Sequence, residues 1–400
     1  MSWTTHDELR GQLLSLWERG DWLAATVRGE ALFPHRLRLR RPGSRDLAGD
    51  FAAVRAWVQQ LQAGSREARG YGYEITWRRV NHRVHGANDL PDGAMVPSEA
   101  DGLRLIGKTQ EAERFQALAN ETLRRFPQLT DWLARRPLQV LAEAEAWLRV
   151  LAVLDWFRAH PRPGIYLRQL DIQGVDTKFI EARRKLFVEL LDAVLPEAAI
   201  DPAATGARGF ERRYGLREKP ALVRFRLLDP ALYVQGMSDL SVPINQFAAL
   251  RLPVRRVFIT ENEINGLVFP AHPDSLVIFG LGYGLKRLAR VDWLQDVEVY
   301  YSGDIDTYGF DMLHRLRTQI PQARSLLMDR MTLNTHRALW GCEDKEKRVT
   351  GELSQLTAEE QSLYVDLRDN VLGERLRLEQ ERIGFRYLRS RLQALETERA

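Results

Sequence analysis

The stretch Val257-Phe258-Ile259-Thr260-Glu261-Asn262-Glu263 is an apolar strand that runs directly into two acidic residues. A second stretch, Val297 to Tyr301, leads in the same way into Gly303-Asp304-Ile305-Asp306-Thr307-Tyr308-Gly309. Both patterns place carboxylates at the carboxyl end of a predicted strand, which is where ligands gather in parallel sheets. Residues two apart in an extended segment point the same way, so Asp304 and Asp306 can converge on one cation.

Outward from these stretches, apolar runs alternate with helical segments, and this alternation predicts a largely parallel, Rossmann-like sheet with helices on both faces. Strands are expected at 254–260, 275–279, 297–301 and 323–328, and helices at 264–269, 283–291 and 308–319. Residues 357–395 are expected to form two charged trailing helices. The expected fold class is therefore multidomain, α/β and α+β, with the parallel sheet in the C-terminal domain.

If the strands that precede Glu261 and Asp304 are neighbours, then Glu261, Asp304 and Asp306 meet at one edge of the sheet. Three carboxylates repel one another, and a hard, oxygen-seeking cation is their natural counter-charge. The sequence therefore predicts a Mg²⁺ site, at which Mn²⁺ could substitute. The structural alternative is that the Asp-x-Asp is a turn in which Asp306 caps the following helix.

The first 155 residues are expected to form a helix-rich domain that contains two arginine-rich, strand-like stretches. Helices are expected at 7–17, 47–62, 109–126 and 138–156, and strands at 35–40 and 73–84. In the first strand, leucines alternate with arginines, which gives one apolar and one cationic face. Such strands are either solvated surface or part of an arm that contacts phosphates.

Residues 156–250 contain a turn at Gly174, a helix cap at Asp176 or Thr177, and an amphipathic helix from Lys178 to Leu195. The polar side of this helix is basic, with the candidate DNA-binding residues Lys178, Arg183, Arg184 and Lys185. A winged-helix unit has this pattern, and so has a bundle helix with a solvated basic face. The segment from Ala221 to Leu228 fits a wing strand or the start of the next sheet.

Among the 58 basic residues, 51 are arginine and 7 are lysine, and the net charge is +4. Arginine forks match phosphate geometry, but high-GC coding also favours arginine, so this composition is mild support for nucleic-acid binding. The single cysteine, Cys342, excludes an internal disulfide and a thiolate metal cage. No apolar run is long enough for a membrane span and no signal pattern is present, so a cytoplasmic protein is expected.

The segment from Val257 to Phe310 resembles the Toprim domain of topoisomerases, primases and repair nucleases, whose signature is a Glu after one strand and an Asp-x-Asp after a later one. It is most similar to the catalytic subunit of topoisomerase VI and its meiotic relative. The matching motifs are Glu261-Asn262-Glu263, Gly280-Leu281-Gly282-Tyr283-Gly284 and Asp304-Ile305-Asp306-Thr307-Tyr308-Gly309.

Two further segments, Gly174 to Glu181 and Arg224 to Pro230, look like JetD, the family of nuclease subunits of the bacterial Wadjet plasmid-defence system. This resemblance covers most of the chain. It implies an N-terminal arm domain at 1–155, a winged-helix (CAP-like) DNA-binding domain and connector at 156–250, and a Toprim catalytic domain with C-terminal helices at 251–400.

The resemblance also implies a metal-dependent endonuclease that hydrolyses closed-circular, double-stranded DNA as a homodimer. Its expected partner is an SMC or condensin-like motor complex of the same defence system. Glu263 is expected to be an outer ligand or general base, or else an exposed charge at a helix start. Lys286 and Arg287, after Gly284, are expected to hold DNA phosphates.

Three other classes of function agree less well with the sequence. A topoisomerase would attach a tyrosine to DNA and religate the strand, but the Arg-x-x-Tyr-Tyr motif is missing, and neither Tyr166 nor Tyr214 has the flanking pattern. A non-catalytic DNA-binding adaptor is disfavoured because Glu261 and the Asp-x-Asp are intact. A small-molecule phosphotransferase would leave the basic helix without a role.

Overall fold

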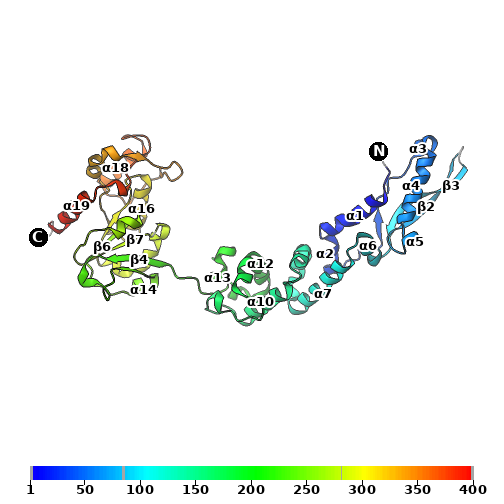
Figure 1. Ribbon diagram of the computed structural model, residues 1–400, viewed down its shortest axis with the longest axis horizontal. Coiled ribbons are helices and arrows are strands. Elements are labelled where there is room, and N and C mark those ends of the chain that lie inside the picture. Colours follow the sequence, from blue (N-terminus) through cyan, green and yellow to red (C-terminus); the bar gives the residue numbers. More distant parts are fainter. Residues whose placement is uncertain (1–2, 83–85, 281, 398–400) are drawn as a thin grey trace. The chain divides into compact units, whose positions relative to one another are not determined.

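The computed structural model describes residues 3–82, 86–280 and 282–397. The chain divides into two compact units, one ending at Glu218 and the other beginning at Lys219 (Figure 1). The expected boundary at 250/251 falls inside the second unit, because strands upstream of it join that unit's sheet. Within the described ranges, no helix is both long and apolar enough to cross a membrane.

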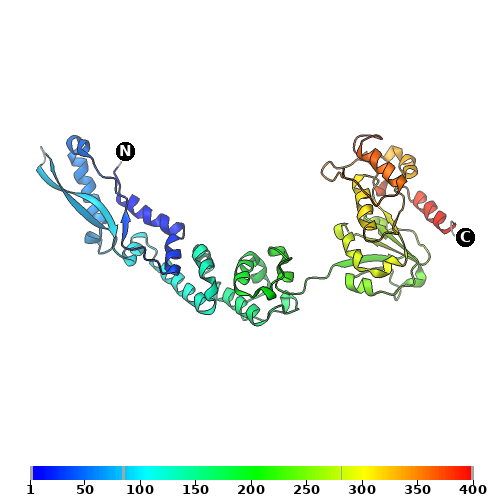
Figure 2. The same cartoon turned by 180° about the vertical axis from the view of Figure 1, so that it is seen from behind.

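The first part of unit 1 combines helices with a three-stranded antiparallel sheet of order β1-β3-β2. Its strands are β1 (His35–Leu37), β2 (Glu74–His82) and β3 (Gly86–Val96). Its helices are α1 (His6–Glu18), α2 (Asp21–Arg28), α3 (Ser44–Gly49), α4 (Phe51–Gly64), α5 (Arg66–Arg69), α6 (Glu99–Ile106), α7 (Thr109–Arg125), α8 (Thr130–Arg135) and α9 (Pro137–Ala142). Strands β2 and β3 form a long hairpin (Figures 1 and 2).

The expected helices at 7–17 and 109–126 are confirmed as α1 and α7. In place of the single helix expected at 47–62, the structure has two helices, α3 and α4. The second is capped by Asp50, whose side chain accepts the Ala53 N–H at 2.9 Å. Strand β3 was missed because its sequence contains Pro91 and Gly93, which ordinarily argue against a strand. Pro91 is tolerated beside a register shift of the hairpin. Val84, the expected end of β2, lies outside the described residues.

The second part of unit 1 is helical, with α10 (Trp147–Ala159), α11 (Thr177–Ala182), α12 (Arg184–Val194) and α13 (Phe210–Arg213). The prediction of a single helix at 178–195 was wrong in one respect, because the helix is interrupted at Arg183 and forms α11 and α12. The expected cap is confirmed, since the Asp176 carboxylate accepts the Phe179 N–H at 2.7 Å. Residues 147–218, all described, contain no strand and hence no wing hairpin. One apolar core extends from Leu9 to Leu216 and joins both parts.

Unit 2 is built on a six-stranded sheet of order β5-β4-β7-β6-β8-β9. Its strands are β4 (Leu222–Leu227), β5 (Asp239–Pro243), β6 (Arg256–Thr260), β7 (Ser275–Phe279), β8 (Glu298–Ser302) and β9 (Arg324–Ser325). The four strands β7, β6, β8 and β9 are parallel, and β4 and β5 are antiparallel additions at one edge. The predicted, largely parallel sheet is confirmed, and the segment from Ala221 to Leu228 belongs to it rather than to a wing.

Helices cover both faces of this sheet. Val257 and Ile259 of β6 pack into a core with Phe310 of α16 (Thr307–Arg317), whereas Phe258 faces the other way, into a core with Leu392 of α19 (Phe385–Thr397). This alternation is the period of two expected for a strand buried on both sides. The helices are α14 (Ile244–Ala249), α15 (Glu263–Leu267), α16 (Thr307–Arg317), α17 (Arg330–Thr335), α18 (Ala358–Arg368) and α19 (Phe385–Thr397).

The region expected as two trailing helices contains α18 and α19, but the residues between them take another form. Strand β11 (Leu376–Arg377) pairs antiparallel with β10 (Gly341–Cys342). The neighbouring Leu378 forms a backbone bridge with Ile305, with N···O distances of 2.9 and 3.1 Å. The segment between the two helices is therefore attached to the Asp-x-Asp loop.

Candidate functional site

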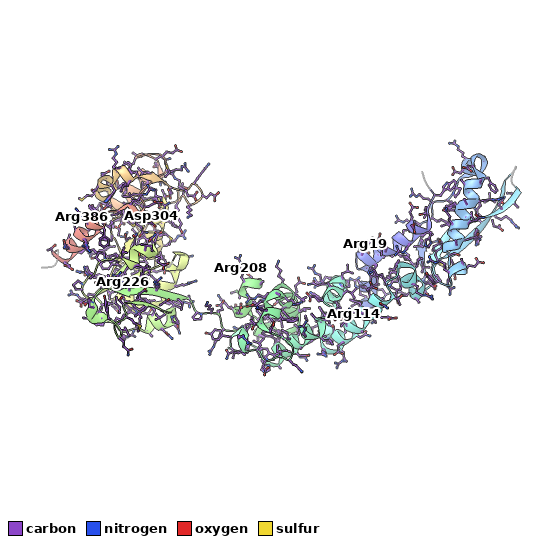
Figure 3. All side chains as sticks on the ribbon, viewed as in Figure 1. Arg19, Arg114, Arg208, Arg226, Asp304 and Arg386 are labelled. Atoms are coloured by element: carbon purple, nitrogen blue, oxygen red, sulfur yellow. The ribbon has the colours of Figure 1, made fainter. Side chains whose placement is uncertain are left out.

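The two strands that lead into the acidic residues are neighbours, as the predicted site required. β6 and β8 pair in parallel, with Thr260 opposite Ser302. Glu261 and Gly303 are therefore the first residues beyond the paired ends, and Asp304 follows immediately. Because both strands end at the same edge, their carboxylates are brought to one region of unit 2, in which Figure 3 labels Asp304.

Glu261 is held at this edge by a tyrosine within the strand beside it. Its Oε1 accepts a hydrogen bond from the hydroxyl of Tyr301, a fully buried residue of β8. Burial raises the pKa of Glu261 above its ordinary value, and burial also raises the pKa of Tyr301. A Cβ atom at Gly303 would lie 2.6 Å from Glu261 Oε1, so the carboxylate keeps this position only because residue 303 is glycine.

Asp304 and Asp306 share a partner that the sequence did not reveal, Arg377 of β11. Arg377 Nε lies 3.1 Å from Asp304 Oδ2 and 3.3 Å from Asp306 Oδ2, and a second guanidinium nitrogen also bonds Asp304. Asp304 Oδ1 accepts the backbone N–H of Gln380 at 2.8 Å. Both aspartates thus face one cation in this structure, the guanidinium of Arg377.

Asp306 also caps α16, which was the structural alternative for this residue. Its Oδ1 accepts the N–H of Gly309 at 2.7 Å. A Cβ at Gly309 would lie 2.1 Å from the carbonyl oxygen of Asp304, so only glycine permits this tight turn. Burial raises the pKa of Asp306 to about 7. Capping and ligand binding are compatible, since the cap uses one oxygen and leaves the other facing Arg377.

A fourth acidic residue, Glu343, was missed from the sequence and lies behind the Asp-x-Asp loop. Its side chain is buried, and its Oε1 accepts the Thr307 hydroxyl at 2.5 Å and the Tyr308 N–H at 3.1 Å. Its Oε2 is buried and has no hydrogen-bond partner among the described residues. The charge of Glu343 adds to the burial that raises the pKa of Asp306. Its motif, Cys-Glu-Asp in a polar stretch, gave no signal.

The donor set suits a hard divalent cation, although the carboxylates are not closed around a common point. Among the described residues, no three acidic, histidine or cysteine side chains are arranged to hold a metal. Glu261 faces Tyr301, while Asp304 and Asp306 face the guanidinium of Arg377. The guanidinium of Arg377 lies between the two aspartates, where a metal ion is expected as counter-charge. Carboxylate oxygens are the ligands that Mg²⁺ prefers.

Comparison with known protein families matches this region directly. Residues 215–392 match the family model described as "Wadjet protein JetD, C-terminal". The chain belongs to the JetD family. Residues 6–192 match a second model, described as the N-terminal part of an uncharacterized protein conserved in bacteria. No curated protein matches the chain. The resemblance to the JetD family that the sequence motifs indicated is thereby confirmed, and the JetD match contains every residue of the acidic site.

Among the described residues, no hydrogen bond or ion pair joins the other candidate residues of the JetD-matched region to the two aspartates. The Glu263 carboxylate pairs with Arg224 of β4, on the opposite side of β6 from β8. This placement favours the exposed helix-start charge for Glu263 over a ligand or base. Lys286 and Arg287 are exposed on a 3₁₀ helix from Gly282 to Arg290, which replaces the expected α-helix. Leu281 of the glycine motif lies outside the described residues.

The four basic residues expected to bind DNA in unit 1 fall into two pairs. Arg183 Nε lies 2.8 Å from Glu143, and Arg184 pairs with Glu211, so both are engaged within the unit. Lys178 and Lys185 are exposed and make no ion pair with any described residue. Arginine side chains are found on both units, among them Arg114 and Arg208 of unit 1 and Arg386 of unit 2 (Figure 3).

The raised pKa of Asp306 predicts how the metal-free protein responds to pH. The folded carboxyl has a pKa of about 7 against an ordinary 3.8, so stability is lost as pH rises from about 4 to 7 and is level above. Asp306→Asn carries no charge and can still accept the Gly309 N–H. In EDTA, its free energy of unfolding relative to the parent should rise by about 2 to 3 kcal/mol between pH 5 and pH 8. Urea unfolding of both proteins at the two pH values measures this difference. If the free energies of unfolding of parent and variant change equally with pH, the ionisation of Asp306 does not destabilise the fold.

Proposed function

We propose that the chain is the nuclease subunit of a Wadjet anti-plasmid system and cleaves closed-circular, double-stranded DNA by metal-assisted hydrolysis. The observation that carries the proposal is the placement of Glu261, Asp304 and Asp306 at the ends of adjacent parallel strands, in a chain that belongs to the JetD family. Family membership supports a Wadjet role and a partnership with the other Wadjet subunits.

In this proposal Asp304 and Asp306 hold Mg²⁺, or Mn²⁺ in its place, with Glu261 as a further ligand beside them. The bound ion would polarise a phosphoryl oxygen and neutralise charge on the leaving 3′-oxygen. Tyr301 fixes the Glu261 carboxylate at the strand end by its hydrogen bond. Gln380 and Gly309 fix the two aspartates by their N–H groups, so the ligands are oriented before any substrate arrives.

The finer domain assignments belong to the same proposal. Acidic residues after β6 and β8 of a parallel sheet fit the Toprim signature. The Asp176-capped α11 and the basic start of α12 fit a helix-turn-helix that contacts DNA backbone, although without a wing in residues 147–218. The working unit is proposed to be a homodimer, with one site for each DNA strand, and an SMC or condensin-like motor complex is proposed to deliver the DNA.

The direct test is cleavage of closed-circular plasmid by the full chain together with the other Wadjet subunits. The proposal expects linear product in Mg²⁺ or Mn²⁺, and none in EDTA. Cleavage that is equally fast in EDTA would overturn the metal-assisted mechanism. Absence of any cleavage in the complete system would overturn the nuclease assignment.

A non-catalytic DNA-binding adaptor is the second candidate, and one observation favours it. Asp304 and Asp306 already have a cation in Arg377, so the acidic residues can be explained as a structural network without a metal. The adaptor predicts that the full chain binds plasmid but does not bind Mn²⁺. Measurable Mn²⁺ binding that depends on Asp304 would exclude it.

DNA binding by unit 1 gives a separate prediction. Lys178→Gln combined with Lys185→Gln should weaken plasmid binding and reduce the slope of log K against log salt by about 2, since each lost phosphate contact removes about 0.9. The matched control is Lys108→Gln, which removes a lysine that already pairs with Glu111 at 2.6 Å. Fluorescence anisotropy across a salt series measures the slope. An unchanged slope in the double variant would mean that these lysines are only solvated.

A further inference from the structure

Arg377 is a basic side chain that contacts both aspartates of the acidic site. It lies on β11, and its guanidinium contacts Asp304, Asp306 and, at 3.4 Å, Glu379. Its side chain is 31% exposed, so the charge is only partly solvated. Within the described part of unit 2, this one guanidinium thus contacts three carboxylates.

A metal ion and this guanidinium compete for the same oxygens. Two N–H groups of Arg377 donate to Oδ2 of Asp304, and its Nε lies 3.3 Å from Oδ2 of Asp306. A Mg²⁺ ligand oxygen must lie about 2.0 to 2.1 Å from the ion, with its lone pair directed at the metal. The other oxygen of each aspartate, Oδ1, accepts one backbone N–H. The guanidinium therefore lies where a metal would approach the Oδ2 atoms, and a metal that binds both of these oxygens must displace it.

Release of the side chain does not require the backbone to separate. Leu378, the next residue, is bridged to Ile305 by two backbone hydrogen bonds, and Asp304 accepts the Gln380 N–H. These bonds hold β11 against the Asp-x-Asp loop independently of the guanidinium. The long arginine side chain can swing away and keep Glu379 as its partner.

We propose that Arg377 is the built-in counter-ion of the acidic site, and that a divalent cation binds Asp304 and Asp306 only by displacing its guanidinium. This inference rests on the proposed function, because it assumes that the site takes a metal. Without metal, Arg377 offsets part of the negative charge of the aspartates and stabilises the folded loop. With metal, the guanidinium is released at the rim of the site, where its charge suits a DNA phosphate.

The test is Mn²⁺ binding to the full chain without DNA, by calorimetry or electron paramagnetic resonance. Arg377→Gln removes the competitor and should bind Mn²⁺ about tenfold more tightly, as when a binding-competent state rises from roughly a tenth of molecules to nearly all. Its metal-free melting temperature should fall, and its stabilisation by Mn²⁺ should grow. Arg377→Lys keeps the charge but loses the fork that spans both aspartates, so its affinity should rise less.

The matched control is Arg382→Gln, on the same segment. Arg382 bonds Glu379 and the Leu339 carbonyl, both at 2.9 Å, and no bond joins it to either aspartate in the described structure. Its Mn²⁺ affinity should equal that of the parent. Parent binding as tight as that of both Arg377 variants would overturn the inference and leave the proposed function standing. Failure of every protein to bind Mn²⁺ would overturn both, because no metal would then exist to displace Arg377.

Discussion

Asp304→Asn is expected to lower the rate of Mg²⁺-dependent plasmid cleavage by about a thousandfold or more, equivalent to roughly 4 kcal/mol of transition-state stabilisation. The substitution removes one carboxylate charge from the proposed metal site, and it replaces the oxygen that Arg377 bonds with an amide NH2 group. An asparagine Oδ1 can still accept the Gln380 N–H, which keeps the loop in position. The rate of loss of supercoiled plasmid, measured with the other Wadjet subunits present, gives the size of the effect.

The control for this experiment is Asp369→Asn. Asp369 makes two bonds to its neighbour Arg368, at 2.8 and 3.0 Å, at the end of α18 and outside the acidic cluster. Its loss should leave cleavage unchanged, whereas Glu261→Gln should be nearly as damaging as Asp304→Asn. Parent-like cleavage by Asp304→Asn would mean that the metal site is misassigned and that another part of the chain performs the chemistry.

The placement of the carboxylates could be predicted because it depends on local rules. A strand that is apolar on both faces must be buried between helices, and a parallel sheet brings all such strand ends to one edge. The strand from Ser275 to Phe279 has the predicted bounds, and β6 and β8 end where Glu261 and Asp304 require. Only the adjacency of β6 and β8 was assumed, and the pairing of Thr260 with Ser302 confirms it.

The counter-charge could not be predicted, because it comes from far along the chain. Arg377 is separated from Asp304 by 73 residues and lies in a stretch whose leucines suggested a helix. In place of that helix the structure has the short strand β11. Its Leu376 packs into the core that contains Phe310 of α16. Glu343 was missed for the same reason, because no feature of the adjacent sequence indicates that its carboxylate is buried at the start of α16. Sequence patterns report the burial of an element, but long-range side-chain pairing follows from the fold.

Tyr166 and Tyr214, the two candidate nucleophiles for a topoisomerase mechanism, differ in how far they are buried. Tyr214 is fully buried, and its hydroxyl donates to Asp192 at 2.7 Å, while burial raises the pKa of that hydroxyl. A tyrosine in this position supports the core and cannot reach a DNA phosphate without local unfolding. Tyr166 is 41% exposed and is thus the tyrosine of the two that an experiment must test.

Hydrolysis and tyrosyl transfer leave different DNA ends, and this gives the most decisive prediction for the reaction. Attack by water breaks the bond between phosphorus and the 3′-oxygen, which leaves a 3′-hydroxyl and a 5′-phosphate with no protein attached. Attack by a tyrosine would leave the protein joined to a DNA end through a phosphotyrosine. The expected product is therefore linear DNA whose ends a ligase can seal after denaturation and protease-free purification.

Tyr166→Phe should cleave at the parental rate, because a hydrolytic site needs no tyrosine nucleophile. Tyr214→Phe should also retain cleavage, although it loses the bond to Asp192 and should melt at a lower temperature. Glu261→Gln should lose cleavage while keeping the parental fold. Recovery of DNA bound to the chain through Tyr166 after denaturation, together with loss of cleavage in Tyr166→Phe, would replace hydrolysis with strand transfer. Free, ligatable ends from all tyrosine variants would instead support hydrolysis at the carboxylates that follow β6 and β8.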